Sequence, residues 1–387
     1  MMGVSSVKTE HMQLISMLRA RMHGQTLPKP DNAYLPQTVR LALQHKLGPF
    51  MCQWLMEYPQ EGSAVLPELT ASAHQAIFRD TQFDFVRTQI TQVLTEHGIN
   101  HVFMRGVCLK ENYPDPTLRT MSDIDILVKA SDFSRIRKAM VALGAELCRG
   151  DGNHRTFRFP EGVTVEFHPN LIHCSCPVGT LVNPGWQYVP EGQPAGEQIM
   201  TDEGFYINVM AHLANHFVAG GVGVRFVLDI WVCRHLRSPQ MDRQWVEQEL
   251  QRIGLLAFAR NMEALAEWWF SGAPETPVLQ ALADYIFSSG SHGEEERAML
   301  NAICLSPKKS RGSALWHKIF YPRQDLENRF DWVIGRPWLL PVAWIVRAWK
   351  ALTERWGKIS HWHKGTRKFT DEDIDQQRKL LREFGIN

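Results

Sequence analysis

The stretch SDIDILV, residues 122–128, places two aspartates one residue apart inside an otherwise apolar run. Side chains alternate across a β-strand, so Asp123 and Asp125 share one face, roughly 7 Å apart at their Cα atoms, while Ile124 and Ile126 share the other. Two carboxylates this close raise each other's pKa unless a cation neutralises them, and hard oxygen ligands suit Mg²⁺ or Mn²⁺. The pair predicts a divalent metal site; the alternative is a strand end whose acids meet solvent.

A second stretch, VTVEFHPN at residues 163–170, shows the same alternation. Its valines and phenylalanine face one way, and Glu166 and His168 face the other. If this strand neighbours the first, Glu166 is a third carboxylate, and three acids on adjacent strands are suited to two-metal phosphoryl transfer. We expect His168 to act as a base or as a partner of Glu166, and His154 is a weaker candidate for such a role.

A glycine and three cations lie near these strands in the sequence. Gly106 follows a predicted strand and precedes a short helix, where backbone N–H groups can approach phosphate oxygens and a helix N-terminus favours anions. Arg105, Lys110 and Arg119 lie close by along the chain. We expect these four residues to bind phosphate groups, against the alternative of a glycine turn without a ligand.

The elements that must position these residues form a small α/β unit around a mixed sheet. Its order is strand, helix, strand, helix, strand, strand, and a turn at 161–162 joins the last two strands. Ser131 is the predicted N-cap of the second helix and Gly144 its predicted stop. The expected strands cover residues 99–106, 122–130, 155–160 and 163–170, and the expected second helix covers 131–146.

Helical periodicity surrounds this unit on both sides. Apolar residues recur at three- and four-residue spacing before residue 95 and again from about 202 to 305, and Gly98 is the predicted stop of the first helical stretch. A Pro- and Gly-rich stretch at 175–200 predicts a loop. We therefore expect four regions: a helical region at 1–95, an α/β core at 96–175, a loop and helical domain at 176–305, and a C-terminal region at 306–387.

Bulk composition limits the class of protein. The chain has 387 residues, more than one hydrophobic core usually holds, and its net charge of +1 indicates no partner. The sequence has no signal-peptide pattern and no apolar run long enough to cross a membrane. Seven scattered cysteines fit reduced thiols rather than a disulfide framework or a zinc site. We expect a soluble, cytoplasmic protein.

The C-terminal region is basic and rich in tryptophan. It holds seven of the thirteen tryptophans, and residues 308–368 contain fourteen Lys and Arg against four Asp and Glu. The favoured interpretation is a helix that packs its tryptophans onto the preceding helical domain. Contact of residues 331–368 with a membrane surface is the first alternative, and contact with nucleic acid is the second.

The order and spacing of these motifs resemble the nucleotidyltransferase superfamily of the DNA polymerase beta type. They resemble more closely a family of uncharacterised bacterial nucleotidyltransferases. Two positions depart from the usual pattern: Arg105 replaces a lysine, and Val107 replaces a serine. The matching elements are Arg105-Gly106, Tyr113-Pro114, Arg119, the strand Asp123 to Val128, Glu166-Phe167-His168, His212 with His216, and Arg225 with Asp229.

This resemblance implies an α+β fold in which helical regions flank a small mixed-sheet nucleotidyltransferase core. It implies that two Mg²⁺ or Mn²⁺ ions on Asp123 and Asp125 hold a nucleoside triphosphate, and that Glu166 completes the first metal site. A nucleoside monophosphate would pass to an unidentified acceptor (a small molecule, sugar or peptide) with release of pyrophosphate. The alternatives are a toxin-like transferase that modifies tRNA or protein, and a non-catalytic nucleotide-binding module.

Two further pairs carry open alternatives. His212 and His216 are four residues apart on a predicted helix, so they share a face. Zinc binding by this pair is disfavoured because Leu213 stands where metalloproteases place a glutamate, which leaves helix packing or substrate contact. Arg225 and Asp229 share the same spacing; we expect a structural ion pair, and otherwise an Arg225 that contacts phosphate.

Overall fold

The structure is a computed structural model. It describes residues 8–148, 154–172, 183–290, 295–306, 312, 323, 326, 330–333, 336–354, 361–362 and 365–386.

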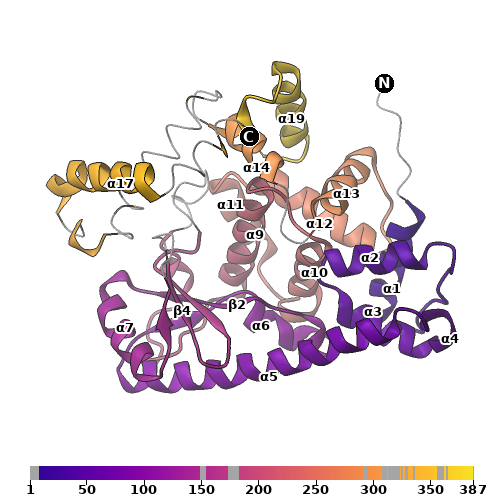
Figure 1. Cartoon of the computed structure of the whole chain (residues 1–387), viewed down its shortest axis with the longest axis horizontal. Helices are drawn as coiled ribbons and strands as arrows, with labels where there is room; N and C mark the ends of the chain where they lie inside the picture. The colour runs from indigo at the N-terminus through magenta and orange to yellow at the C-terminus, as the bar shows by residue number, and fades with distance from the viewer. Residues whose placement is uncertain are drawn as a thin grey trace.

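The N-terminal region is helical, as its periodicity predicts. The longest helix, α5, runs beneath both the other N-terminal helices and the sheet (Figure 1). It begins with a proline in its first turn and ends before Gly98, whose φ of 60° stops the helix as predicted. The helices are α1 (Thr9–Met22), α2 (Leu35–Gln44), α3 (Gly48–Glu57), α4 (Pro59–Gly62) and α5 (Leu66–Glu96).

A five-stranded mixed sheet lies at one end of α5, in the order β1-β2-β5-β4-β3. β2 and β5 are parallel, and the other neighbouring pairs are antiparallel. This is the mixed sheet expected from the sequence. Its strands are β1 (His101–Phe103), β2 (Asp123–Val128), β3 (Glu146–Leu147), β4 (Arg155–Arg158) and β5 (Thr164–His168), and two helices, α6 (Gly106–Leu109) and α7 (Phe133–Ala142), connect parts of it.

The two faces of the sheet have different neighbours. Ile124, Ile126 and Val165 are buried in one apolar cluster with residues of α5 and α7, including Ile90 and Ile136. Leu127, on the opposite face of β2, belongs to the large cluster formed by the helical regions. The alternation predicted for β2 is confirmed, so the two aspartates face away from α5 and α7.

Two details of the α/β unit differ from the sequence-based expectation. Ser131 is not a helix cap: it lies inside a 3₁₀ turn, Ala130–Asp132, and α7 begins at Phe133 without a side-chain cap. The short strand β3 was not expected, because two residues are too few for any periodicity to show. Gly144, with φ of 81°, ends α7 as predicted.

The second helical region packs over the other face of the sheet. Its first helix begins at the N-cap Thr201, whose hydroxyl accepts a hydrogen bond from the Gly204 amide. The helices here are α9 (Asp202–Val218), α10 (Val224–Val232), α11 (Arg243–Arg252), α12 (Leu256–Ser271), α13 (Pro277–Ser289) and α14 (Glu295–Leu305), and α17 (Leu340–Glu354) and α19 (Asp371–Glu383) follow.

The tryptophans of the C-terminal region do not all pack as favoured by the sequence analysis. Trp362 is buried in the main core, but Trp338 and Trp349 are 70% and 69% exposed. Together with Val342 and Ile345 they form an exposed apolar stripe along α17 and the turn before it, because these positions recur at helical spacing. Packing onto the helical domain is thus wrong for Trp338 and Trp349, while Trp316 and Trp356 lie outside the described residues.

Among the described helices, none combines the length and the apolar character that a membrane crossing requires. The five described cysteines are free thiols, and Cys174 and Cys176 lie outside the described residues. Burial raises the pKa of Cys108 to about 11, and its thiol donates to the Phe103 carbonyl, which fits a packing residue.

Candidate active site

Pairing of β2 with β5 brings the three predicted carboxylates together. Asp125 lies directly beside Glu166 in the parallel register, and Asp123 lies beside Thr164. The expectation that the strand of Glu166 lies next to the strand of the two aspartates is therefore confirmed. The acids project from the sheet toward α9 and α10, whose residues His212, Arg225 and Asp229 line a small cavity of about 60 Å³ together with both aspartates.

Asp125 is held by two protein cations. Its Oδ2 lies 2.8 Å from Nη1 of Arg105, and its Oδ1 lies 2.8 Å from Nε2 of His168. Burial alone would raise the pKa of this carboxyl, but Arg105 and His168 together hold it well below its usual range. Asp125 is therefore ionised across the physiological pH range.

Asp123 has the opposite environment. Burial and the neighbouring Asp125 and Glu166 raise its pKa to about 7, and Arg105 and His168 offset this only in part. No ion pair reaches Asp123 within the part of the chain that the structure describes. Three clustered carboxylate groups, one of which forms no ion pair with the described residues, match the donor chemistry of a Mg²⁺ or Mn²⁺ site.

Two imidazoles surround the third carboxylate. Nε2 of His168 lies 3.4 Å from one oxygen of Glu166, and Nε2 of His154 lies 3.4 Å from the other. Burial would lower the pKa of His168, yet hydrogen bonds to Asp125 and Glu166 raise it above its ordinary value. The donor atoms of His154, Glu166 and His168 all lie within 4.8 Å of one another, so they are a second group with the chemistry of metal ligands.

The turn after β1 is shaped by Arg119. A Cβ atom on Gly106 would lie 2.8 Å from Nη1 of Arg119, so glycine is what allows the guanidinium to lie against this turn. Nε and Nη2 of Arg119 donate to the two oxygens of Asp229, at 3.1 and 2.7 Å, and the Tyr113 hydroxyl donates to Asp229 at 2.7 Å. All three residues are buried.

The ion pair expected between Arg225 and Asp229 is wrong. Asp229 faces Arg119 and Tyr113 instead, and Nη1 of Arg225 donates to the Thr120 carbonyl. Burial and the neighbouring Arg119 lower the pKa of Arg225 to about 10. Arg225 lines the same cavity as Asp123, which leaves the second interpretation, contact with phosphate.

The histidine pair lies at the edge of this cavity. Nε2 of His212 lies 2.9 Å from Nε2 of His216, and both rings lie against Phe226. Burial and Arg105 hold the pKa of His212 well below its usual range, so it is neutral. The pair belongs to no group of three metal-ligating side chains in the described residues, and only His212 lines the cavity.

The structure does not bring Lys110 to Asp123, Asp125 and Glu166. Its side chain is fully buried, and Nζ lies 2.8 Å from Asp80 and contacts Asp84, both on α5. The lysine near the site is instead Lys46, which sequence reasoning missed. Its charge interacts with those of Asp123 and Arg225. No local signal could identify Lys46, because it lies in a helical turn far from the strand motifs in the sequence.

We expect the stability of the metal-free protein to fall as the pH rises from about 4 to about 7. The folded state keeps the Asp123 proton up to a pKa of about 7, whereas the unfolded state loses it near 4, so the folded state binds more protons in this interval. The raised pKa of His168 acts in the same direction, since its stabilisation is complete below the unfolded pKa and lost above the folded one. Asp125, with its lowered pKa, loses its contribution only in acid.

Thermal unfolding followed over this pH range, with a chelator and with Mg²⁺, checks this expectation. Mg²⁺ should raise the Tm more at the upper end of the range, where Asp123 is ionised. A Tm that is independent of pH, or a larger Mg²⁺ effect at the lower end, would contradict it.

Comparison with known proteins agrees with this geometry. A family described as uncharacterised nucleotidyltransferase matches residues 33–271, more than half of the chain, and this range contains every carboxylate, arginine and histidine of the site. No curated protein and no solved structure matches the chain.

Proposed function

The chain belongs to the uncharacterised nucleotidyltransferase family, and from this premise we propose that it transfers a nucleoside monophosphate from an NTP to an acceptor, with Mg²⁺ or Mn²⁺ and release of pyrophosphate. The observation that carries the proposal is the position of Asp123. It stands beside Asp125 and Glu166 with no ion pair to any described residue, and Arg119 and Arg225 line the same cavity. Acids that need a metal, next to cations that suit phosphate, are the equipment of phosphoryl transfer.

Each group has a part in this reaction. Asp123, Asp125 and Glu166 would hold the divalent ions, which when bound would neutralise the developing charge on the phosphates. Arg225 is placed to donate hydrogen bonds to the triphosphate, because it lines the cavity that contains both aspartates. Gly106 keeps the turn open for Arg119, and Arg105 and His168 keep Asp125 ionised.

The acceptor hydroxyl would lose its proton on the Glu166 side of the sheet. Glu166 lies between His154 and His168, so its carboxylate oxygens are oriented by both rings. A proton taken by Glu166 could pass to His154, which is half-buried. We propose a small molecule, sugar or peptide as the acceptor.

The test is pyrophosphate release from each of the four NTPs with Mg²⁺ or Mn²⁺, with and without cell extract as the acceptor source. The parent protein should release pyrophosphate, and the double variant Asp123→Ala/Asp125→Ala should not. Radiolabel recovered in total RNA or in protein would instead support the toxin-like transferase. Nucleotide binding without release under any condition would overturn the proposal in favour of a binding module.

A further inference from the structure

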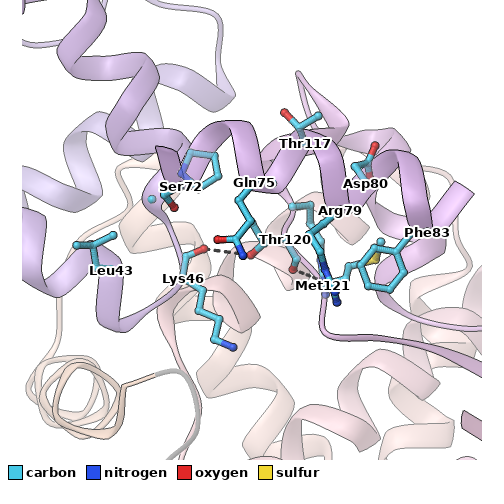
Figure 2. Close-up of a pocket in the computed structure, with 14 residues that line it drawn as sticks. Leu43, Lys46, Ser72, Gln75, Arg79, Asp80, Phe83, Thr117, Thr120 and Met121 are labelled. Atoms are coloured by element: carbon cyan, nitrogen blue, oxygen red, sulfur yellow. Dashed lines mark hydrogen bonds between the residues drawn. The ribbon is translucent and has the colours of Figure 1, made fainter. Parts of the chain in front are cut away.

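A larger cavity, of about 300 Å³, adjoins the carboxylate site. It lies between the α2–α3 turn, the first half of α5 and the loop that precedes β2, and Figure 2 shows Lys46, Gln75 and Arg79 around it. Arg119 and Met121 line both this cavity and the smaller one that contains Asp123. The two spaces are therefore neighbours that share a wall.

Lys46 occupies an unusual backbone position at the edge of this cavity. Its amide donates to the Leu43 carbonyl and the next amide, of Leu47, donates to the Ala42 carbonyl, the pattern of a helix end that normally contains glycine. Lys46 has φ of 58°, and Arg105, with φ of 57°, is the only other non-glycine residue at positive φ in the part of the chain described. Both are cations beside the carboxylates.

This conformation has a structural cost that glycine would avoid. A left-handed residue with a Cβ atom is about 1–2 kcal/mol less favourable than one in the right-handed region, and strained residues of this kind cluster at functional sites. The chain nevertheless has a lysine here. Because glycine would suit the backbone better, the feature that lysine adds at this position is its charged side chain.

The charge of Lys46 interacts with that of Asp123 without direct contact. Its ammonium forms no ion pair or hydrogen bond with any residue that the structure describes. Asp80 also lines the cavity, but Lys110 already neutralises it at 2.8 Å. Arg119 is likewise paired with Asp229, so Lys46 and Arg79 give the cavity its excess of positive charge, which suits an anion.

Part of the remaining wall is apolar. Leu43, Pro49, Phe83 and Met121 line the cavity, and the Arg79 guanidinium lies 5.2 Å above the Phe83 ring. A site that combines cations with an apolar wall suits a ligand with a charged part and a flat apolar part. A nucleotide has both.

Resting on the proposed function, we propose that this cavity binds the donor NTP, with Lys46 on its phosphates and its base against the apolar wall. Glu166, where the acceptor would lose its proton, lines neither described cavity, so the acceptor side lies elsewhere. The triphosphate is the most highly charged group in the reaction, and the cation-rich side is where it is best neutralised.

Lys46→Gly separates binding from stability. The variant removes the ammonium and relieves the left-handed strain, so its Tm should equal or exceed that of the parent. Binding of the NTPs and of inorganic tripolyphosphate, measured by calorimetry with Ca²⁺ in place of Mg²⁺, should weaken about 10-fold or more, since a hydrogen bond to a charged group is lost. Lys46→Met should weaken both in the same way, and Lys138→Met, on the exposed side of α7, should change neither.

Ala76→Phe tests the other part of the ligand. Ala76 lines the cavity from α5, and a phenyl group there should exclude the base while tripolyphosphate still binds. If Lys46→Gly and Lys46→Met bind NTPs and tripolyphosphate as tightly as the parent, the proposal is wrong. That result is distinct from failure of the proposed function, in which the parent binds NTPs but never releases pyrophosphate.

Discussion

Asp125→Asn should lower pyrophosphate release about 1,000-fold or more. Loss of the carboxylate removes several kcal/mol of metal-dependent charge stabilisation, and each 1.36 kcal/mol corresponds to a factor of ten in rate. The same change leaves Arg105 and His168 without their shared anion in a site that is only 13% exposed at Asp125. The metal-free variant should therefore also be less stable than the parent, by about 2 kcal/mol.

Asp123→Asn should abolish turnover to a similar extent but change stability in the opposite direction. Burial and the neighbouring Asp125 and Glu166 raise the pKa of Asp123, so its charge opposes folding, and the full cost is present above about pH 7. A neutral amide of the same shape should stabilise the metal-free protein by about 1 kcal/mol at that pH. The stabilisation should vanish below about pH 4, where Asp123 is protonated in both the folded and the unfolded state.

Urea unfolding of both variants in the presence of a chelator, together with pyrophosphate release in Mg²⁺, measures these effects. Asp375→Asn is a suitable control, because Asp375 is exposed on α19 and pairs with Arg378, three residues away. It should change neither quantity. Equal stability changes in Asp123→Asn and Asp125→Asn would contradict the assigned environments.

Asp229→Ala should destabilise the protein by about 3–5 kcal/mol, the largest stability effect expected of any single substitution discussed here. Asp229 is 3% exposed, and its removal leaves the buried Arg119 guanidinium and the Tyr113 hydroxyl without their acceptor. An uncompensated buried charge is the reason for the size of the effect. Arg119 also lines both cavities, so NTP binding should weaken as well.

Chemical denaturation measures this loss, and a second variant shows its origin. In Arg119→Met/Asp229→Leu no buried charge is left unpaired, so the double variant should be more stable than Asp229→Ala. Glu247→Ala removes one acid from an exposed pair with Arg260 and should cost less than about 1 kcal/mol. A double variant as unstable as the single one would show that packing, not the unpaired charge, determines the loss.

Several residues with local signals, though not the predicted N-cap Ser131, were placed correctly from the sequence alone. A strand has a period of two, so the shared face of Asp123 and Asp125 follows from their spacing, and the apolar alternation of residues 163–167 puts Glu166 on the corresponding face of its own strand. The helix stops at Gly98 and Gly144 follow from the freedom of glycine at positive φ. The α+β class and the family follow from the order of these elements.

Partners across the fold were decided only by the tertiary structure. The four-residue spacing of Arg225 and Asp229 predicted a local pair, yet Asp229 binds Arg119, 110 residues away in the sequence. Helical spacing brings two side chains within reach but does not rank them against an arginine that arrives from another element. Asp229 is buried where the sheet meets α10, and there the bidentate ion pair with Arg119 is stronger than a pair with Arg225 would be.

Contacts between distant elements also determine the positions of the Lys110 and Lys46 side chains. Lys110 is near Gly106 in the sequence, but its side chain turns to α5, where Asp80 and Asp84 neutralise it. Lys46 lies in a helical turn with no motif around it, and only the packing of α2, α3 and α5 against the loop before β2 places it beside Asp123. The sequence by itself determined which faces the acids occupy, because that depends on local geometry; which cations meet them depends on contacts between distant elements, and those exist only in the folded chain.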